Sequence, residues 1–390
     1  MNRHPKLLKI SPPILEVEND VWRVSALVND EPVWFEGSGA NARASVEAFA
    51  GLFLLPAMSR GIPLRVEAPL DREWLDNIHR QQEIFQHWWN YPIIPIESEV
   101  RASADQPKQE RTALFFTCGV DSFYSLLHSD YAVDALVTVH GYDIHLSDRS
   151  HAGLVMESVA EVARKSGKRA IQVRTNVREH RWFKKPSWVK THGAGLAAIG
   201  HLLGPDYNRW LISSSNNRVY DVPNGSHWDT DPLWSSSNVR FVHVADDVWR
   251  NDKVAAISRN DVAQQHLTVC YNYVKRGNQR NCSRCEKCVR TMLLLKQQGR
   301  LHEFKVFAID RGLAALIDDV GWIADFRIPV YRRYIENEPD PAIRQALERL
   351  IARSNRLRLF LVKLQQWAAR RLSRLRRFFT DSAGGSNRRA

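Results

Sequence analysis

The sequence has no long hydrophobic run and few cysteines, and each shortage excludes a class of protein. No stretch approaches the roughly 18 apolar residues of a membrane-spanning helix, and the longest candidates are short, such as Gly51–Pro56. The N-terminal MNRHPKLLKISPP has no apolar stretch of signal-peptide length, so we do not expect export. Only 5 cysteines occur in 390 residues, which suits a reducing compartment better than a disulfide framework. We therefore predict a cytoplasmic protein.

Acidic residues are scarce in one segment, the C-terminus. Residues 351–390 hold 11 of the 55 basic residues but only one of the 43 acidic residues, so the rest of the chain is nearly balanced. A protein that follows a nucleic-acid backbone should draw Lys and Arg from its folded body. Nucleic acid is therefore the less favoured partner. At 44% hydrophobic and 25% charged residues, the composition excludes general disorder and allows about two or three domains.

The first 100 residues predict a small α+β domain. Apolar and polar residues alternate over Val21–Val28, and a turn at Asn29–Pro32 leads into a second run, which together indicate a hairpin. Helical spacing follows over residues 42–58, and Asp71 can cap a second helix that runs to about Trp89. Residues 101–111 are rich in charge, contain proline and have no periodicity, so we predict a linker there.

From residue 112 short apolar strands alternate with helices. Strands are predicted over residues 113–116, 135–139, 170–173, 210–212 and 241–244, with helices over 123–127, 151–166 and 188–203. This alternation predicts an α/β fold with a doubly wound, mainly parallel sheet. Such sheets bind ligands at the carboxyl ends of their strands. We place this domain at residues 112–300, followed by a helical connection at 301–340.

The loop after the first of these strands predicts an anion site. In Ala113–Ser122 a buried strand enters a tight turn that opens a helix. Backbone N–H groups, the Thr117 and Ser122 hydroxyls and the helix dipole would all favour phosphate. The loop has neither the G-x-x-x-x-G-K-[ST] nor the G-x-G-x-x-G pattern. Asp121 would repel phosphate unless it holds Mg²⁺ or lies beside the site. The alternative is an ordinary strand-to-helix turn.

Four of the five cysteines form a metal-ligand pattern. Cys270-x11-Cys282-x2-Cys285-x2-Cys288 offers thiolates that can surround one ion. Four thiolates complete a tetrahedral site with no open position, which predicts structural zinc. An iron–sulfur cluster is the rival interpretation, since C-x2-C-x2-C also occurs in ferredoxins. Unliganded thiols are the third.

The two motifs together resemble a known family. TCGVDS, residues 117–122, is similar to the SGGxDS loop of the PP-loop ATP pyrophosphatases, which are adenine nucleotide alpha hydrolase-like and HUP-like in fold. Thr117 replaces the serine and Cys118 replaces a glycine. With the cysteine cluster about 150 residues later and Lys253 between, residues 112–295 resemble the 7-cyano-7-deazaguanine synthase branch, in which four cysteines hold zinc.

The resemblance implies an ATP-dependent carbon–nitrogen ligase. Such an enzyme adenylates a small-molecule carboxylate, releases pyrophosphate and AMP, and transfers nitrogen from a nitrogen donor, with ATP, Mg²⁺ and Zn²⁺ as cofactors. It implies catalytic roles for Asp121, Ser122 and Lys253. It also implies nucleotide binding by Thr117, Cys118, Gly119, Val120, Asp121, Ser122, Thr138 and His140, and metal binding by Cys270, Cys282, Cys285 and Cys288. In place of the usual glycine, the Cys118 side chain could weaken nucleotide binding.

Two alternatives stay open for the reaction. One is a PP-loop enzyme that transfers sulfur or nitrogen to RNA, and the other is a nucleotide-binding scaffold in which Cys118 has ended catalysis. The substrate side is predicted at residues 216–234, whose Asn, Arg, His, Asp and Trp suit a polar ligand, or form a plain surface loop. Lys190–Gly193 opens a helix that could face an anion, although Thr191 can simply be its cap.

Residues 341–390 predict a basic amphipathic helix and a disordered tail. Apolar residues recur at helical spacing with arginines around the other side. The helix could dock on its own protein or on a partner subunit in a homodimer, lie on an anionic membrane surface, or bind RNA. Docking is the commonest fate of such a helix.

Overall fold

The computed structural model describes residues 7–103, 110–270, 279–356 and 360. The chain divides into two compact units. Unit 1 comprises Met1–Asn281 and His302–Val306, and unit 2 comprises Cys282–Leu301 and Phe307–Ala390. The division therefore falls at residue 281, whereas the sequence led us to expect a domain that ends at 300.

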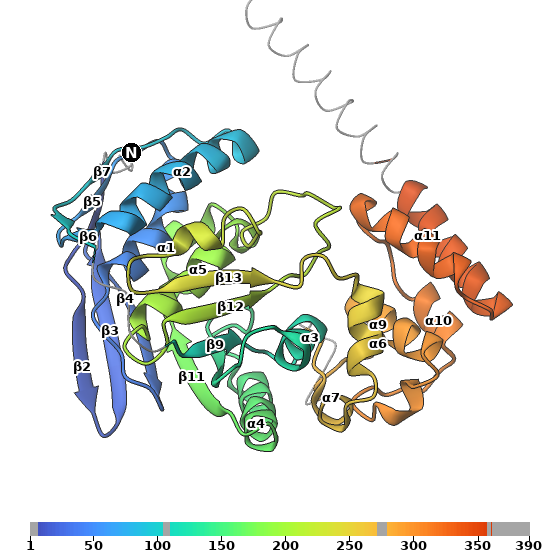
Figure 1. Cartoon of the computed structure of the whole chain (residues 1–390). Helices are drawn as coiled ribbons and strands as arrows, with labels where there is room; N and C mark the ends of the chain where they lie inside the picture. Colours follow the sequence, from blue (N-terminus) through green and yellow to red (C-terminus); the bar gives the residue numbers. More distant parts are fainter. Residues whose placement is uncertain (1–6, 104–109, 271–278, 357–359, 361–390) are drawn as a thin grey trace, which may run out of the picture. The chain divides into compact units, whose positions relative to one another are not determined.

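Unit 1 is built on one 11-stranded sheet with the strand order β13-β12-β9-β10-β11-β4-β3-β1-β5-β7, in which β2 also pairs with β3 (Figure 1). A separate two-stranded sheet joins β6 and β8. The strands are β1 (Leu8–Ile10), β2 (Ile14–Glu18), β3 (Val21–Val28), β4 (Glu31–Ser38), β5 (Leu64–Val66), β6 (Leu70–Asp71), β7 (Ile96–Glu97), β8 (Val100–Arg101), β9 (Thr112–Phe115), β10 (Ala135–His140), β11 (Arg169–Thr175), β12 (Arg209–Ser213) and β13 (Arg240–Val244).

The central part of this sheet confirms the predicted α/β fold. β9 pairs in parallel with β10 and with β12, β10 with β11, and β12 with β13. These strands are apolar runs because side chains on both faces are covered. Ala113 and Phe115 belong to the core that includes Phe49, whereas Leu114, between them, is buried outside that core.

The N-terminal strands belong to the same sheet, which differs from the separate domain expected for residues 1–100. β4 pairs antiparallel with β11, and Gly37 lies opposite Val173. A Cβ at Gly37 would lie 2.6 Å from the Trp22 ring and 2.7 Å from the Gln172 carbonyl oxygen, so only glycine fits at this junction. The proposed linker at 101–111 begins in β8, and residues 104–109 lie outside the described part of the chain.

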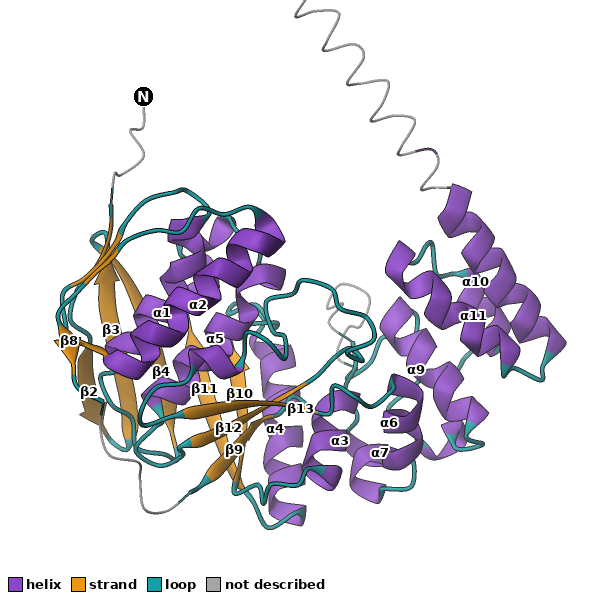
Figure 2. Ribbon diagram, turned by 45° about the horizontal axis from the view of Figure 1, so that its top comes forward, coloured by secondary structure: helices purple, strands orange, loops and turns teal. Residues whose placement is uncertain are grey.

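Helices cover both faces of the sheet. α1 (Val46–Met58), α2 (Arg72–Trp89) and α5 (Trp188–Leu202) lie together on one face, and α4 (Arg149–Lys165) lies on the other (Figure 2). The described part of unit 1 also contains the helices α3 (Val120–His128), α6 (Arg250–Ile257) and α7 (Asp261–His266). Asp71 caps α2 as predicted, since its carboxylate accepts from the Trp74 N–H over 3.1 Å.

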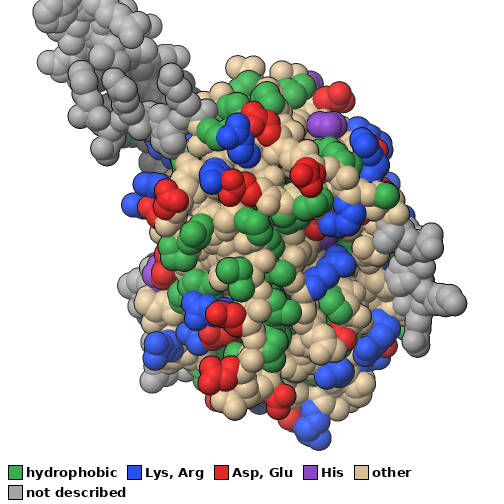
Figure 3. All heavy atoms as spheres, turned by 90° about the vertical axis from the view of Figure 1, so that its left-hand side faces the viewer, with side chains coloured by type: hydrophobic (Ala, Val, Ile, Leu, Met, Phe, Trp, Pro, Cys, Tyr) green, Lys and Arg blue, Asp and Glu red, His purple; other side chains and the backbone are tan. Residues whose placement is uncertain are grey.

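Apolar side chains remain exposed on the outer face of β2 and β3 (Figure 3). Ile14 is 62% exposed, and Val21 and Leu27 on β3 are exposed on the same face of the sheet. In β3 the alternate side chains Trp22, Val24 and Ala26 are buried, so the patch is the opposite face of the strand. The homodimer predicted from the sequence stays a prediction.

Unit 2 is helical, with α9 (Glu286–Gln297), α10 (Leu313–Asp318), α11 (Ile328–Glu336) and a helix over residues 341–356. The partly buried Glu286 connects α9 to α11 and to the turn before it. Its carboxylate pairs with Arg327 and accepts from the Tyr331 hydroxyl over 2.9 Å. Most of the predicted basic helix, residues 357–359 and 361–390, lies outside the described residues. None of the described helices combines the length and apolar content needed to cross a bilayer.

Candidate nucleotide-binding cavity and metal cluster

The predicted anion loop lies where the strand order of the parallel sheet reverses. β9 is the first strand of that sheet in the chain, and its neighbours β10 and β12 are the second and fourth. Connections leave such a point toward opposite faces of the sheet, which opens a crevice at the carboxyl ends of the strands. Thr117–Ser122 follow β9 directly and therefore stand at this crevice.

The loop adopts a strained backbone at Cys118. Its φ is +58°, a left-handed conformation that glycine adopts readily and that costs other residues about 1–2 kcal/mol. The Cys118 carbonyl accepts from the Thr268 N–H over 2.8 Å, which helps to hold the turn. The Cys118 thiol is fully buried, and burial raises the pKa of this thiol. The side chain is not among the described residues that line the cavity, so its sulfur does not occupy ligand space.

Gly119 borders a cavity at the start of α3. A Cβ there would lie 3.7 Å from Thr117 Oγ1 and 3.8 Å from Ser122 Oγ, which are ordinary contacts. Its φ of −78° suits any residue, so the fold of the loop does not require glycine. Gly119 is the N-cap of α3 and provides no side-chain cap, which leaves the first backbone N–H groups of the helix available to an anion.

Two cations of α6 contact the Asp121 carboxylate. Arg250 Nη1 donates to Asp121 Oδ2 over 2.8 Å, and Lys253 Nζ lies 3.7 Å from Asp121 Oδ1. Lys253 is 1% exposed, and its ammonium also donates to the Ser214 carbonyl over 2.8 Å. Burial lowers the pKa of Lys253, while the Asp121 carboxylate acts in the opposite direction. Asp121 is thus neutralised by α6, and its predicted Mg²⁺ contact stays a prediction.

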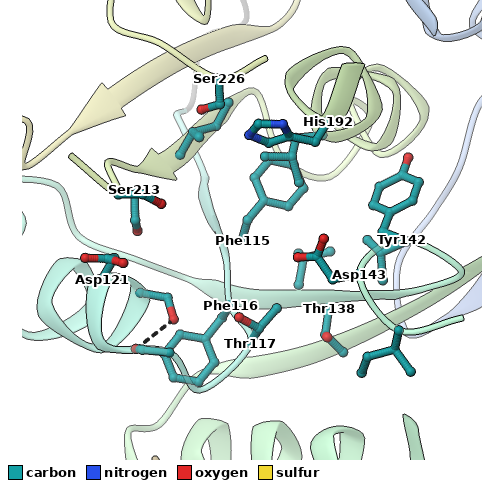
Figure 4. A pocket seen from close by; sticks show the side chains of 18 of the residues that line it. Phe115, Phe116, Thr117, Asp121, Thr138, Tyr142, Asp143, His192, Ser213 and Ser226 are labelled. Carbon is teal, nitrogen blue, oxygen red and sulfur yellow. Dashed lines mark hydrogen bonds between the residues drawn. The ribbon is translucent and has the colours of Figure 1, made fainter. Parts of the chain in front are cut away.

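A cavity of about 210 Å³ opens beside the loop. Figure 4 shows Asp121 and Ser213 on one side of it and His192, Tyr142 and Asp143 on the other, with the Phe115 ring between them. The Tyr142 and Trp188 rings lie 4.8 Å apart, and the Trp188 indole N–H donates to Asp143 over 2.9 Å. The cavity therefore joins a hydroxyl-rich end near α3 to an aromatic end near α5.

The predicted site residues divide into those at the cavity and those behind it. Thr117, Gly119, Asp121, Ser122 and Thr138 line the cavity, and Cys118, Val120, Lys253 and His140 are not among its described lining residues. His140 Nε2 instead bonds to the His145 carbonyl over 3.0 Å, and burial lowers the pKa of His140. From the predicted substrate segment 216–234, the cavity receives Asn216, Asn224 and Ser226.

Sequence reasoning missed Arg250 and the aromatic end. Arg250 lies one helical turn before Lys253 on α6, so their 3-residue spacing was a usable signal once Lys253 had been selected. Tyr142 and Asp143 come just after β10, beyond Gly141, and their position at a strand's carboxyl end was the available signal.

The cysteine cluster forms as predicted and could bind a metal. The sulfur atoms of Cys270, Cys282, Cys285 and Cys288 all lie within 4.8 Å of one another. Cys285 N donates to Cys282 Sγ over 3.3 Å, and Ser283 between them has a left-handed φ of +55°, which turns the chain back on itself. Cys285 is the residue just before α9, whose first turn carries Cys288 with its sulfur 3.5 Å from that of Cys285.

Asn281 brings the two ends of the cysteine segment together. Its side-chain oxygen accepts from the Val269 N–H over 2.9 Å, and its amide donates to the Leu267 carbonyl over 2.8 Å. Asn281 is fully buried, so both contacts are shielded from water. These bonds hold the residue before Cys270 close to the residue before Cys282.

Comparisons with known proteins identify no relative. No family model matches the chain, and no curated protein and no solved structure matches it either. The site must therefore be interpreted from its own geometry.

Proposed function

We propose that the chain is an ATP-dependent ligase that adenylates a substrate carboxylate, releases pyrophosphate and then transfers nitrogen. The observation that carries the proposal is the start of α3 at the strand-order reversal, where no side chain caps the helix and Gly119 borders the cavity. Backbone N–H groups at the start of a helix favour a phosphate group over an uncharged group.

The residues of the loop would act chiefly by binding and placement. The Thr117 and Ser122 hydroxyls and the first N–H groups of α3 would donate to pyrophosphate oxygens, and the cations on Asp121 would offset negative charge nearby. Thr138, at the end of β10, would border the adenosine. Phosphate-transfer chemistry of this kind needs positioned donors and little covalent help from the protein.

We propose zinc as the metal of the cysteine cluster. Four thiolates at the Zn–S distance of about 2.3 Å place tetrahedral sulfurs about 3.8 Å apart. Cys282 Sγ and Cys288 Sγ lie 3.9 Å apart, in agreement with a single ion. A cluster of several irons, with one thiolate on each, would hold the sulfurs farther apart. Bound zinc would stabilise the fold around Cys282–Cys288 and would not take part in the reaction.

The test is turnover by the full chain. ATP, Mg²⁺ and a panel of carboxylates should give AMP and pyrophosphate with at least one acceptor. Gly119→Ala should fold normally, because the new Cβ makes only ordinary contacts, yet it should weaken ATP binding at least tenfold by placing a methyl group beside the Thr117 and Ser122 hydroxyls, where a phosphate would lie. Gly153→Ala in α4, where a Cβ meets nothing within 4 Å, is the matched control.

Two outcomes would change the proposal. Tight ATP binding without AMP formation, with every acceptor tested in a metal-loaded sample, would favour the nucleotide-binding scaffold. Equal ATP binding by Gly119→Ala and the parent would overturn the assignment of the loop itself.

A further inference from the structure

The proton positions at the α5 end of the cavity are fixed by the protein. His192 Nδ1 lies 3.1 Å from the Val189 carbonyl oxygen, which can only accept, so Nδ1 carries the proton. The lone pair of a neutral His192 then lies on Nε2, which has no hydrogen-bond partner among the described residues. His192 lines the cavity and can therefore present an acceptor to a ligand.

The hydroxyl proton of Ser226 is also held by the protein. Its hydroxyl donates to Asp231 Oδ2 over 2.6 Å, and His243 Nδ1 lies 2.7 Å from the same oxygen. Asp231 is fully buried, so the hydroxyl proton is directed into the protein by a shielded carboxylate. Ser226 lines the cavity and is left with lone pairs to offer there.

Two glycines place Ser226 beside His192. A Cβ on Gly193 would lie 2.0 Å from the Gly225 carbonyl oxygen, and one on Gly225 would lie 2.7 Å from His192 Nδ1. The loop and α5 thus touch through their backbones, and the Gly225 N–H donates to the Val189 carbonyl over 2.9 Å. The two acceptors are therefore neighbours because of the fold.

Asp143 and two aromatic rings complete this end of the cavity. One Asp143 oxygen accepts from the Trp188 indole, and the carboxylate faces the cavity (Figure 4). The faces of Tyr142 and Trp188 attract cations. Arg178, whose guanidinium carbon lies 5.3 Å from the Trp188 ring, is not among the described residues that line the cavity.

We propose that this end of the cavity is a subsite for a cationic nitrogen group with several N–H donors, such as ammonium, a primary amine or an amidinium. His192, Ser226 and Asp143 all offer acceptors, and the negative charge of the Asp143 carboxylate would repel a carboxylate or phosphate there. In the proposed ligase this group would be the nitrogen donor, and that assignment rests on the proposed function. The binding preference itself does not.

The test uses three probes of one shape: benzamidine, benzamide and benzoate. Calorimetric titration of the full chain without ATP should show benzamidine binding at least tenfold tighter than benzamide, with benzoate weakest. Asp143→Asn and Ser226→Ala should each weaken benzamidine binding about tenfold. Glu157→Gln, which removes an exposed acid on α4, should leave binding unchanged.

The outcomes separate this inference from the proposed function. Benzoate binding as tightly as benzamidine, or benzamidine binding unaffected by both Asp143→Asn and Ser226→Ala in folded samples, would overturn the subsite. The titration contains no nucleotide, so it does not depend on the ligase reaction. If the chain prefers benzamidine but never forms AMP, the subsite proposal stands and the ligase proposal is rejected.

Discussion

Arg250 donates to the Asp121 carboxylate over 2.8 Å, although 129 residues separate them in the chain. Both side chains are 18% exposed, so water screens the pair only in part. A carboxylate in an anion-binding turn would repel phosphate by itself. The contacts with Arg250 and Lys253 offset this negative charge, which is compatible with the proposed phosphate site in the loop.

Asp121→Asn is expected to cost stability as well as activity. The change leaves buried Lys253 and partly buried Arg250 without their carboxylate, so the free energy of unfolding should fall by about 2 kcal/mol. Urea unfolding of the single variants and of Asp121→Asn with Arg250→Gln would measure the coupling between the two positions. Additive effects would show that the pair carries no interaction energy.

Cys118 is expected to resist alkylation in the folded protein. Burial raises the pKa of its thiol, and the thiolate is the reactive form. Iodoacetamide at pH 8, followed by peptide mass spectrometry, should leave Cys118 unmodified until denaturant is added. Rapid native modification would contradict the buried position of the thiol.

We expect the bound metal, and the stability that it provides, to depend on the four clustered cysteines and not on Cys118. Cys288→Ser should lose the bound ion and lower the unfolding midpoint, as should a strong chelator, because binding of structural zinc is worth about 10 kcal/mol in small domains. Cys118→Ser is the matched control and should keep about one zinc per chain by elemental analysis. A brown protein that absorbs visible light would indicate iron–sulfur instead.

The buried His201 predicts a loss of stability in acid. Burial is the chief cause that lowers the pKa of His201 to about 4, against about 6.5 in an unfolded chain. Between these values the unfolded state binds more protons, so the contribution is complete above pH 6.5 and is lost as the pH falls toward 4. At pH 5 the loss should be about 2 kcal/mol.

His201→Gln isolates this effect. Chemical unfolding at pH 7.5 and pH 5 should show a smaller loss of stability in the variant than in the parent. Equal losses would mean that His201 is not the group responsible.

Local patterns predicted the parallel strands and their helices. β9–β13 were identified to within about two residues because a strand covered on both faces is a continuous apolar run. The cysteine cluster was equally predictable from the sequence, since the spacing of the ligands along the chain reflects the geometry of the ion.

Long-range contacts could not be predicted from local sequence patterns. The β4–β11 pairing and the Arg250–Asp121 ion pair join distant segments, and no local residue pattern specifies the partner. Cys118 adopts a left-handed backbone conformation that usually favours glycine. The residue type therefore did not indicate this conformation, nor that the side chain would lie outside the cavity.

The β4–β11 pairing sets a limit on how the chain can be shortened. The family resemblance begins at residue 112, and a fragment that starts there would uncover the edge of β11 that pairs with Phe35–Ser38. Unpaired edges of this kind recruit strands from other molecules. A fragment intended for crystallisation or screening should therefore begin before β3, so that the β3–β4 hairpin still covers the edge of the parallel strands and limits aggregation.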